Sequence, residues 1–588
     1  MIFQPNFLSG ETPLLEYPRP QFQRDSYVSL NGVWEYAIKK TSEAFDGNEI
    51  GAKYDGEIVV PYSPESKLSG VERQPKKDET LFYRRLFSLP ENFQKDKVLL
   101  NLGAVAQVCK VFVNGKCVGE HEGGYVPFTI DITPALQAGK NLLTVAVQDD
   151  ADTEIYGRGK QRYKRGGIWY TATSGIWQSV WLESVPSGYL ESMRLTPCAA
   201  EKTLRVQLET ETNGEVNPFK IVVKDGETVL EEKTFSEKEI TLYLPNCKLW
   251  TTENPELYSL TVYCGEDKVE SYFGLRDFSR VEVGGFQTFA LNGKPIFHNG
   301  LLDQGYWHEG LYTPPTNRAM FEEVQAVKRL GFNMLRKHIK IEPALWYYYC
   351  DISGVLVWQD FINGGGAYKP LRIMLAPFIN LHLNDGNYAS MRRSEASREW
   401  FYKEAFGTVD TLYNCVSLCL FTPFNEAWGQ FDALKTWEIM KAYDPTRLYD
   451  HASGWQDMGG GDVCSKHIYF RKAKLKNDKK RVLALTEFGG YSLAVKGHTF
   501  SGKKFGYKSF QNADSLLAAY EKLYYTEILP QIQTQGLCGT VYTELTDIED
   551  EVNGLFTFDR VLKIDGEKIR KINDDLYAAF DSFVGKFQ

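Results

Sequence analysis

Long uninterrupted apolar runs are missing from this sequence of 588 residues. A helix that crosses a membrane needs about 18 or more consecutive, mostly apolar residues, and no such stretch occurs. The start of the chain also lacks a basic segment followed by an apolar one, the pattern of a secretory leader. We therefore expect no membrane partner and a cytoplasmic location.

Closely spaced metal motifs are missing as well. The ten cysteines include no CxxC pair and the eight histidines include no HExxH, so the sequence predicts neither a structural metal nor a disulfide framework. Scattered cysteines of this kind are typical of buried thiols in a reducing compartment. We expect no metal and no cofactor.

Basic residues are in short supply, because 67 Lys and Arg face 76 Asp and Glu and the net charge is −9. Binding to phosphates needs clustered Lys and Arg, and the one dense basic run, residues 471–481, is interpreted as a solvated loop. We therefore expect no nucleic-acid partner. Aromatic residues, at 14%, are plentiful, which suits either a ligand with apolar ring faces or large β-sandwich cores.

Two β-rich regions are predicted first along the chain. Residues 1–186 alternate apolar with polar side chains, and the Asn114-Gly115 step between two such runs is a strong hairpin signal. This pattern predicts a jelly-roll β-sandwich. Residues 187–276 contain shorter strand candidates separated by turn residues, as in an immunoglobulin-like β-sandwich.

The rest of the chain alternates short apolar strands with amphipathic helices, such as those at 317–331 and 343–354, which is typical of a parallel sheet. A (β/α)8 TIM barrel over 277–588 is the favoured interpretation. The alternative, an open doubly wound sheet, needs a glycine-rich turn after its first strand, whereas the GGG at 364–366 follows the third. Residues 362–393 are irregular. Eight strands are predicted, at 295–302, 332–338, 355–361, 415–424, 447–453, 463–469, 482–490 and 536–547.

The carboxyl ends of barrel strands meet on one face, and polar residues there are catalytic candidates. Carboxylates dominate this set, and Glu426 ends the fourth strand while Glu487 ends the seventh. The full set is Asp303, Arg336, Lys337, His338, Asp360, Asn425, Glu426, His451, His467, Tyr469, Glu487, Glu544 and Asp547.

Two carboxyl groups about 5 to 5.5 Å apart are what a retaining glycosidase requires. One attacks the anomeric carbon and the other, held protonated, donates to the leaving oxygen. A neighbouring carboxylate and an apolar wall such as Trp428 would both raise the pKa of the acid, and Asn425 could donate to the sugar 2-hydroxyl. Three other carboxylates compete with Glu426 and Glu487 on composition: Asp303, Asp360 and Glu544.

Five barrel motifs occur together: LNGKPIF at 291–297, NMLRKHI at 333–339, VLVWQDF at 355–361, FNEAWGQ at 424–430 and TEFGG at 486–490. They resemble glycoside hydrolase family 2, the family of β-galactosidases, β-glucuronidases and β-mannosidases. The jelly-roll region, including TSGIWQSVWLE at 173–183, resembles the sugar-binding-like domain of that family. Its members are built as jelly roll, immunoglobulin-like domain and barrel, the order inferred above.

The resemblance implies that Glu426 is the acid/base, Glu487 the nucleophile and Asn425 the residue that touches the 2-hydroxyl. His467, Asp303 and Arg336 are assigned either to substrate or to structural hydrogen bonds in the barrel mouth. The other residues expected to bind substrate are Trp428, His338, Asp360, Tyr469 and Tyr542.

Two departures from the family bear on the sugar. β-Glucuronidases carry an Asn-x-Lys pair after the last strand that grips the sugar carboxylate, and residues 546–560 contain no lysine, which disfavours a uronic acid. Many members have tryptophan where this chain has Tyr542, so we expect a different pocket floor. Some β-galactosidases of the family use magnesium and sodium, for which no ligand cluster stands out.

The prediction is an exo-acting retaining β-glycosidase with a β-galactoside or related neutral sugar as the leading substrate. A β-glucuronidase, a β-galacturonidase or another activity of the family is the alternative, and a non-catalytic glycan-binding protein is the rival from a different class. Transglycosylation uses the same intermediate, so the sequence does not separate it from hydrolysis. A homo-oligomer is left open, and the jelly roll is expected to serve structure, as a wall of the active site or a subunit contact.

Overall fold

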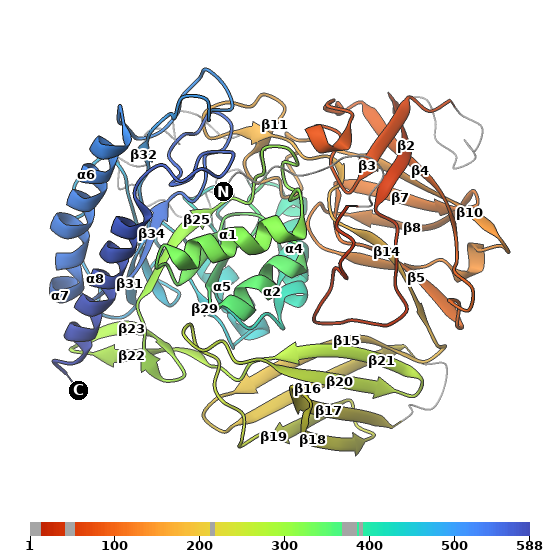
Figure 1. Cartoon of the computed structure of the whole chain (residues 1–588), viewed down its shortest axis with the longest axis horizontal. Coiled ribbons are helices and arrows are strands. Elements are labelled where there is room, and N and C mark those ends of the chain that lie inside the picture. The colour runs from red at the N-terminus through yellow and green to blue at the C-terminus, as the bar shows by residue number, and fades with distance from the viewer. Residues whose placement is uncertain (1–12, 42–52, 212–217, 367–384, 387–391, 588) are drawn as a thin grey trace.

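The computed structural model describes residues 13–41, 53–211, 218–366, 385–386 and 392–587. It contains two β-sandwiches and a barrel of parallel strands (Figure 1). The N-terminal sandwich lies beside the barrel, and the second sandwich lies against both. The predicted fold class is confirmed, whereas the predicted domain boundaries after residues 186 and 276 stay predictions. No helix among the described residues is long and apolar enough to cross a membrane.

The N-terminal sandwich packs a six-stranded sheet on a four-stranded one. Its elements are β1 Val28–Ser29, β2 Gly32–Lys40, β3 Gly56–Val60, η2 Lys67–Ser69, β4 Glu79–Ser88, β5 Lys97–Leu102, β6 Val105–Ala106, β7 Val108–Val113, β8 Lys116–Glu122, β9 Phe128–Asp131, η3 Thr133–Ala135, β10 Lys140–Gln148, β11 Gln161–Arg162, β12 Tyr170–Thr171, β13 Gly175–Ile176 and β14 Val180–Val185. The strand orders are β3-β2-β4-β10-β7-β8 and β1-β14-β5-β9. The predicted hairpin is confirmed: Val113 pairs with Lys116, and Asn114 (φ 52°) and Gly115 (φ 79°) make the left-handed turn between them.

The second sandwich has sheets of three and four antiparallel strands, in the orders β15-β16-β19 and β18-β17-β20-β21. Its strands are β15 Tyr189–Cys198, β16 Thr203–Glu211, β17 Phe219–Asp225, β18 Thr228–Phe235, β19 Glu239–Tyr243, β20 Tyr258–Cys264 and β21 Asp267–Phe273. Arg24 joins the two sandwiches, since its guanidinium lies 2.9 Å from Glu183 of β14 and 2.9 Å from Asp267 of β21.

Eight parallel strands form the barrel, in the order β29-β28-β27-β26-β25-β34-β31-β30. They are β25 His298–Asp303, β26 Met334–Lys337, β27 Leu356–Asp360, β28 Leu418–Thr422, β29 Leu448–Tyr449, β30 Val463–Ile468, β31 Val482–Gly489 and β34 Leu537–Thr543. The first barrel strand in the sequence, β25, pairs both with the second, β26, and with the last, β34, so the sheet curls back on itself. Between β29 and β30, Asp462 N donates to Tyr449 O at 2.7 Å. The eight strands lie where the sequence predicted them, and the doubly wound alternative is wrong.

Helices cover the outside of the barrel, and both helices named in advance, at 317–331 and 343–354, are present as α1 and α2. The barrel strands are buried along their whole length because helices cover one face and the barrel interior the other. Most of the irregular stretch 362–393 lies outside the described residues. The helices are α1 Asn317–Arg329, α2 Ala344–Ser353, α4 Glu395–Leu412, α5 Ala433–Tyr443, α6 Ala513–Leu523, η4 Tyr524–Ile528, α7 Leu529–Gln535 and α8 Gly566–Val584. Short strands outside the barrel sheet complete this region: β22 Phe278–Val283, β23 Phe286–Leu291, β24 Lys294–Pro295, β32 Tyr491–Ser492 and β33 Lys508–Ser509.

Candidate active site

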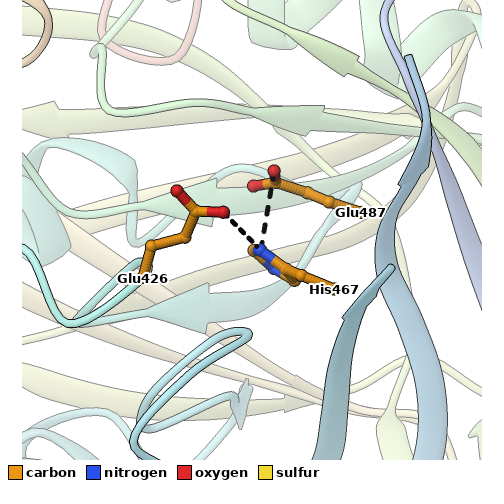
Figure 2. A group of neighbouring side chains, drawn as sticks. All are labelled: Glu426, His467 and Glu487. Carbon is orange, nitrogen blue, oxygen red and sulfur yellow. Dashed lines mark hydrogen bonds and ion pairs between the residues drawn. The ribbon is translucent and has the colours of Figure 1, made fainter. Parts of the chain in front are cut away.

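Glu426 and Glu487 meet at the carboxyl end of the barrel. Glu426 follows β28, Glu487 lies on β31, and the two strands are separated around the barrel by β29 and β30. His467 of β30 lies between them, with Nδ1 2.9 Å from Glu426 Oε1 and 3.6 Å from Glu487 Oε2 (Figure 2). One carboxylate oxygen of Glu426, one of Glu487 and one ring nitrogen of His467 all lie within 4.8 Å of one another. This upper limit on the distance between one oxygen of each carboxyl group is close to the about 5 to 5.5 Å of a retaining pair and well below the about 6.5 to 9.5 Å of an inverting pair.

The turn that carries Glu426 has an unusual backbone. Glu426 (φ 51°) and Ala427 (φ 60°) are both left-handed, a conformation that residues other than glycine adopt at an energetic cost. The turn is held by Glu426 N, which donates to Ser453 O at 2.9 Å, and by Trp428 N, which donates to Asn425 O at 2.9 Å. The surrounding chain therefore imposes the position of this carboxyl group.

Glu487 is surrounded by donors. Arg336 Nη1 lies 3.1 Å from Glu487 Oε1, and the Tyr469 hydroxyl donates to Oε2. Burial acts to raise the pKa of Glu487, but His467, Arg336, His338 and the hydrogen bond from Tyr469 outweigh it, so the pKa lies below the ordinary 4.5. Glu487 is therefore the carboxylate that stays ionised.

Glu426 has the opposite environment. Burial raises its pKa above the ordinary 4.5 and the nearby charge of Glu487 raises it further, while the hydrogen bond with His467 opposes both. The side chain keeps 8% of its surface exposed, enough for a ligand to reach it. The two carboxyl groups are thus pushed in opposite directions, the arrangement that separates an acid from a nucleophile.

Arg336 forms hydrogen bonds with several of the other polar residues of the site. It pairs with Asp360 through two hydrogen bonds of 3.0 Å and donates to Asn425 Oδ1 at 2.8 Å. His338 Nδ1 lies 2.6 Å from the same Asp360. Arg336 therefore fixes the orientation of the Asn425 amide through its oxygen.

Most of the residues predicted from the sequence therefore converge. The structure brings together Asn425, Glu426, Trp428, Arg336, His338, Asp360, His467, Tyr469 and Glu487.

Two predicted residues lie elsewhere. Asp303 binds Lys337 Nζ at 2.6 Å and accepts from Gly305 N at 2.8 Å, so it belongs to a buried ion-pair network. The pocket-floor prediction for Tyr542 is wrong, because its ring packs against Phe488 and against Tyr520 of α6, on the helix-covered side of β34.

Aromatic and basic side chains from outside the barrel strands also lie near the two carboxyl groups, and the sequence analysis did not predict them. Trp169 of the N-terminal sandwich lies 5.7 Å from Trp428, ring centre to ring centre, and Tyr507 stacks on Tyr469 at 3.9 Å. Lys160, also from the N-terminal sandwich, is buried nearby and its charge lowers the pKa of Glu426, against the larger effect of burial. No pattern in the sequence placed Trp169 at the barrel.

The trio Glu426, His467 and Glu487 has the spacing of metal ligands. Its donor atoms are already engaged with one another and with Arg336 and Tyr469.

Two family models match the chain: the glycosyl hydrolases family 2 sugar-binding domain over residues 27–186, and glycosyl hydrolases family 2 over residues 188–276. The chain is 28% identical over 363 residues to a putative β-glucuronidase of Formosa agariphila, covering 58% of this chain and 42% of that protein. It is 27% identical over 353 residues to a β-galactosidase of Thermoanaerobacter pseudethanolicus, covering 57% and 46%. The chain thus spans less than half the length of these relatives.

Solved structures share the whole fold. A β-glucuronidase of Faecalibacterium prausnitzii superposes with a TM-score of 0.71 at 19% identity, covering 95% of this chain and 99% of that one. A β-galacturonidase of Eisenbergiella tayi gives 0.70 at 17% identity, with 95% and 98% covered. Residues 27–276 therefore match glycoside hydrolase family 2, and the whole chain shares the three-part fold of these solved structures.

Proposed function

We propose that this protein is an exo-acting, retaining β-glycosidase that works by double displacement. The observation that carries the proposal is the pair Glu426 and Glu487, which lie close together in the barrel mouth with pKa values displaced in opposite directions. An inverting enzyme needs room for a water molecule between its carboxyl groups, about 6.5 to 9.5 Å. The shorter separation here favours direct attack by one carboxylate.

In the first step, Glu487 attacks the anomeric carbon while Glu426 gives its proton to the departing oxygen. The product is a glycosyl ester of Glu487 and a free alcohol. In the second step, Glu426, now ionised, removes a proton from water, which displaces Glu487 and releases the sugar with its original configuration. One residue thus acts as acid and then as base.

Neighbouring side chains support each step. Tyr469 and Arg336 hold Glu487 in position, and their donors stabilise its negative charge until it attacks. Asn425, fixed by Arg336, presents its amide nitrogen where a 2-hydroxyl would bind, and that bond strengthens as positive charge develops on the sugar ring. Trp428 and Trp169 form an aromatic wall beside the acid.

A β-galactoside or another neutral β-linked sugar is the leading substrate. The Asn-x-Lys pair of β-glucuronidases is missing after the last strand, and the carboxylates around the site disfavour a further negative charge. The relatives include both β-galactosidases and β-glucuronidases, so a uronidase is the alternative.

A panel of 4-nitrophenyl β-glycosides with hexosides, pentosides and uronides tests the proposal. We expect sustained release from a neutral β-glycoside, and NMR of the first-formed sugar should show the β-anomer. Tight sugar binding without release would favour a glycan-binding protein, and an α-anomer as the first product would contradict the retaining mechanism. Products longer than the substrate would identify transglycosylation.

A further inference from the structure

A loop of the N-terminal sandwich, residues 149–171, lies against the barrel mouth, and its β11 is seen at the junction of the two parts in Figure 1. The backbone amides of Arg158 and Gly159 both donate to Asn363 O, at 2.9 and 3.0 Å, three residues after the end of β27. At the far end of the loop, Thr171 N donates to Glu549 at 3.1 Å. The loop is therefore anchored on both sides of the carboxylate pair.

Lys160 lies between these anchors. It is 8% exposed, and its Nζ lies 5.7 Å from the centre of the Tyr170 ring. Within the part of the chain that the structure describes, Nζ forms no hydrogen bond and no ion pair. A buried cationic group without a partner is costly, and this one lies in a site that receives a ligand.

The charge of Lys160 affects the pKa values of three residues at the barrel mouth. Burial dominates the pKa values of Glu426, Glu544 and His338, and in all three the charge of Lys160 contributes by lowering the pKa. These residues follow three different strands, β28, β34 and β26. Lys160 is therefore close enough to act on residues of three strands, and its geometry places it at the Tyr170 ring, which Gln304 links to Glu544.

Glu544 provides the matching group, and burial together with the charge of Glu551 raises its pKa well above 4.5. It is fully buried; its Oε2 accepts from Gln304 Nε2 at 2.5 Å, while its Oε1 has no hydrogen-bond partner among the described residues. Tyr170, whose ring lies beside Lys160, accepts from the same Gln304 at 2.8 Å and donates to Glu551. An unbonded donor and an unbonded carboxyl oxygen thus belong to one connected network.

The charge in this part of the barrel mouth indicates what binds there. A ligand carboxylate would add its charge beside Glu487, which stays ionised, whereas hydroxyl groups can accept from Lys160 and bond to Glu544 without adding charge. The acidic residues there include Glu487, Asp360, Glu551 and Asp547, and the basic ones include Lys160, Lys563 and Arg336; the pKa values of Glu426 and Glu544 are raised, which favours their protonated forms.

We propose that Lys160 and Glu544 bind hydroxyl groups of the terminal sugar, with Lys160 donating to one hydroxyl and the free oxygen of Glu544 bonding to another, and that this pair selects a neutral sugar over a uronic acid. The proposal rests on the proposed glycosidase function and names the groups that read its substrate. It also gives the N-terminal sandwich a direct part in specificity.

The test compares Lys160→Met, Lys160→Arg and Glu544→Gln with the wild type. The substrates are the 4-nitrophenyl β-glycoside that the wild type hydrolyses fastest and its 3-, 4- and 6-deoxy analogues. Lys164→Met is the matched control, because Lys164 is an exposed lysine of the same loop. Circular dichroism and thermal midpoints establish that each variant folds, and Glu544→Gln, which keeps size and shape, tests the site independently of Lys160.

We expect Lys160→Met to lower kcat/KM for the parent glycoside by about 10- to 100-fold, the value of a hydrogen bond to a charged donor. The loss should shrink to within about threefold for the one deoxy analogue that lacks the contacted hydroxyl, and Lys160→Arg should retain more activity than Lys160→Met. Glu544→Gln should also lower kcat/KM for the parent glycoside, and this loss should shrink for the analogue that lacks the same hydroxyl or an adjacent one.

Three results would overturn the proposal. One is an equal loss on all deoxy analogues with a shifted pH profile, since Lys160 would then act only on the pKa of Glu426. Another is an unchanged kcat/KM in Lys160→Met. The third is a wild type that prefers uronides and loses this preference in Lys160→Met, which would make Lys160 an anion-binding residue. A wild type that releases nothing from any glycoside would instead refute the proposed function itself.

Discussion

At the scale of single residues, the site depends on two carboxyl groups with different environments. Replacing Glu487 by glutamine removes the nucleophile but keeps the shape; the amide oxygen can still accept from Arg336, while the amide nitrogen can only donate to the Tyr469 hydroxyl. We expect kcat to fall by about 10³-fold or more with an unchanged thermal midpoint, measured on the best glycoside of the panel. Turnover at the wild-type rate would refute the nucleophile assignment.

Azide separates the roles of the two carboxylates. In Glu487→Ala, azide can enter the vacated space and attack the anomeric carbon directly, which predicts an α-glycosyl azide. In Glu426→Ala, azide replaces water on the glycosyl-enzyme, which predicts a β-glycosyl azide. NMR of the products distinguishes them, and exchanged configurations would reverse the assignments.

The pKa displacements predict the pH dependence of kcat/KM. Activity needs Glu487 ionised and Glu426 protonated, so it should rise with pH through a value below 4.5 and fall through a value above 4.5, both belonging to the coupled pair. Tyr469→Phe removes a hydrogen bond that lowers the pKa of Glu487, so the rising limb should move to higher pH. The exposed Tyr243, changed to phenylalanine, serves as the control and should leave both limbs in place.

Residue types alone identified much of this site. Asn425, Glu426 and Glu487 could be predicted because each ends an apolar strand, and strand ends converge in a barrel. Lys160 and Tyr507 could not, because they lie on loops whose docking depends on contacts with distant parts of the chain. Tyr542 was misplaced because successive side chains of a strand point to opposite sides. A shift of one position in the sequence therefore moves a side chain from the barrel interior to the helix-covered side.

At the scale of elements, the end of β31 determines where Glu487 points. Gly489 has φ +85°, and a Cβ built there would lie 2.3 Å from Cε2 of Tyr542, which is buried between Phe488 and Tyr520. The ring has no free space to move into, so Gly489→Ala combines backbone strain with a clash inside the packed wall.

We expect Gly489→Ala to destabilise the protein by about 2 to 4 kcal/mol and to lower kcat, because Glu487 lies two residues away. Gly497→Ala is the matched control: its φ is +84°, but nothing lies within 4 Å of the added Cβ, so only the backbone cost of about 1 kcal/mol applies. Urea denaturation and turnover measure both effects. Equal effects of the two substitutions would show that Tyr542 gives way.

The elements themselves were largely predictable. The barrel strands and the first two helices follow from periodicity and from turn residues, and the hairpin at Asn114-Gly115 follows from its dipeptide. The left-handed turn at Glu426 and Ala427 was not predictable, because neither residue favours that conformation and only bonds such as that from Glu426 N to Ser453 O impose it.

At the scale of the whole molecule, the N-terminal sandwich contains a half-buried acidic pair that makes its stability depend on pH. Burial raises the pKa of Glu65 to about 8 and that of Asp149 to about 7. Ser174 binds both, through its backbone N at 3.2 Å to Glu65 and its hydroxyl at 2.9 Å to Asp149. These carboxyl groups are therefore protonated in the folded state at a pH where the unfolded chain has released both protons.

A raised pKa in the folded state means that stability is present at low pH and is lost as pH rises through the folded value. Glu65→Gln cannot ionise, so relative to the wild type it should gain unfolding free energy between pH 5 and pH 8, by up to about 1.4 kcal/mol for each pH unit. Urea midpoints across this range provide the measurement, with the exposed Glu57→Gln as control. A difference that does not change with pH would show that Glu65 is ionised in the fold.

The sequence by itself determined the fold class, because periodicity is a local property of the chain, and strand ends together with the family motifs singled out the two central carboxylates. Only the tertiary structure decided which side chains surround those carboxylates, since Arg336, His467 and Lys160 reach the site from separate strands and a separate sandwich. Their distances set the displaced pKa values and the groups that face a sugar, and these distances exist only after the distant segments have packed together.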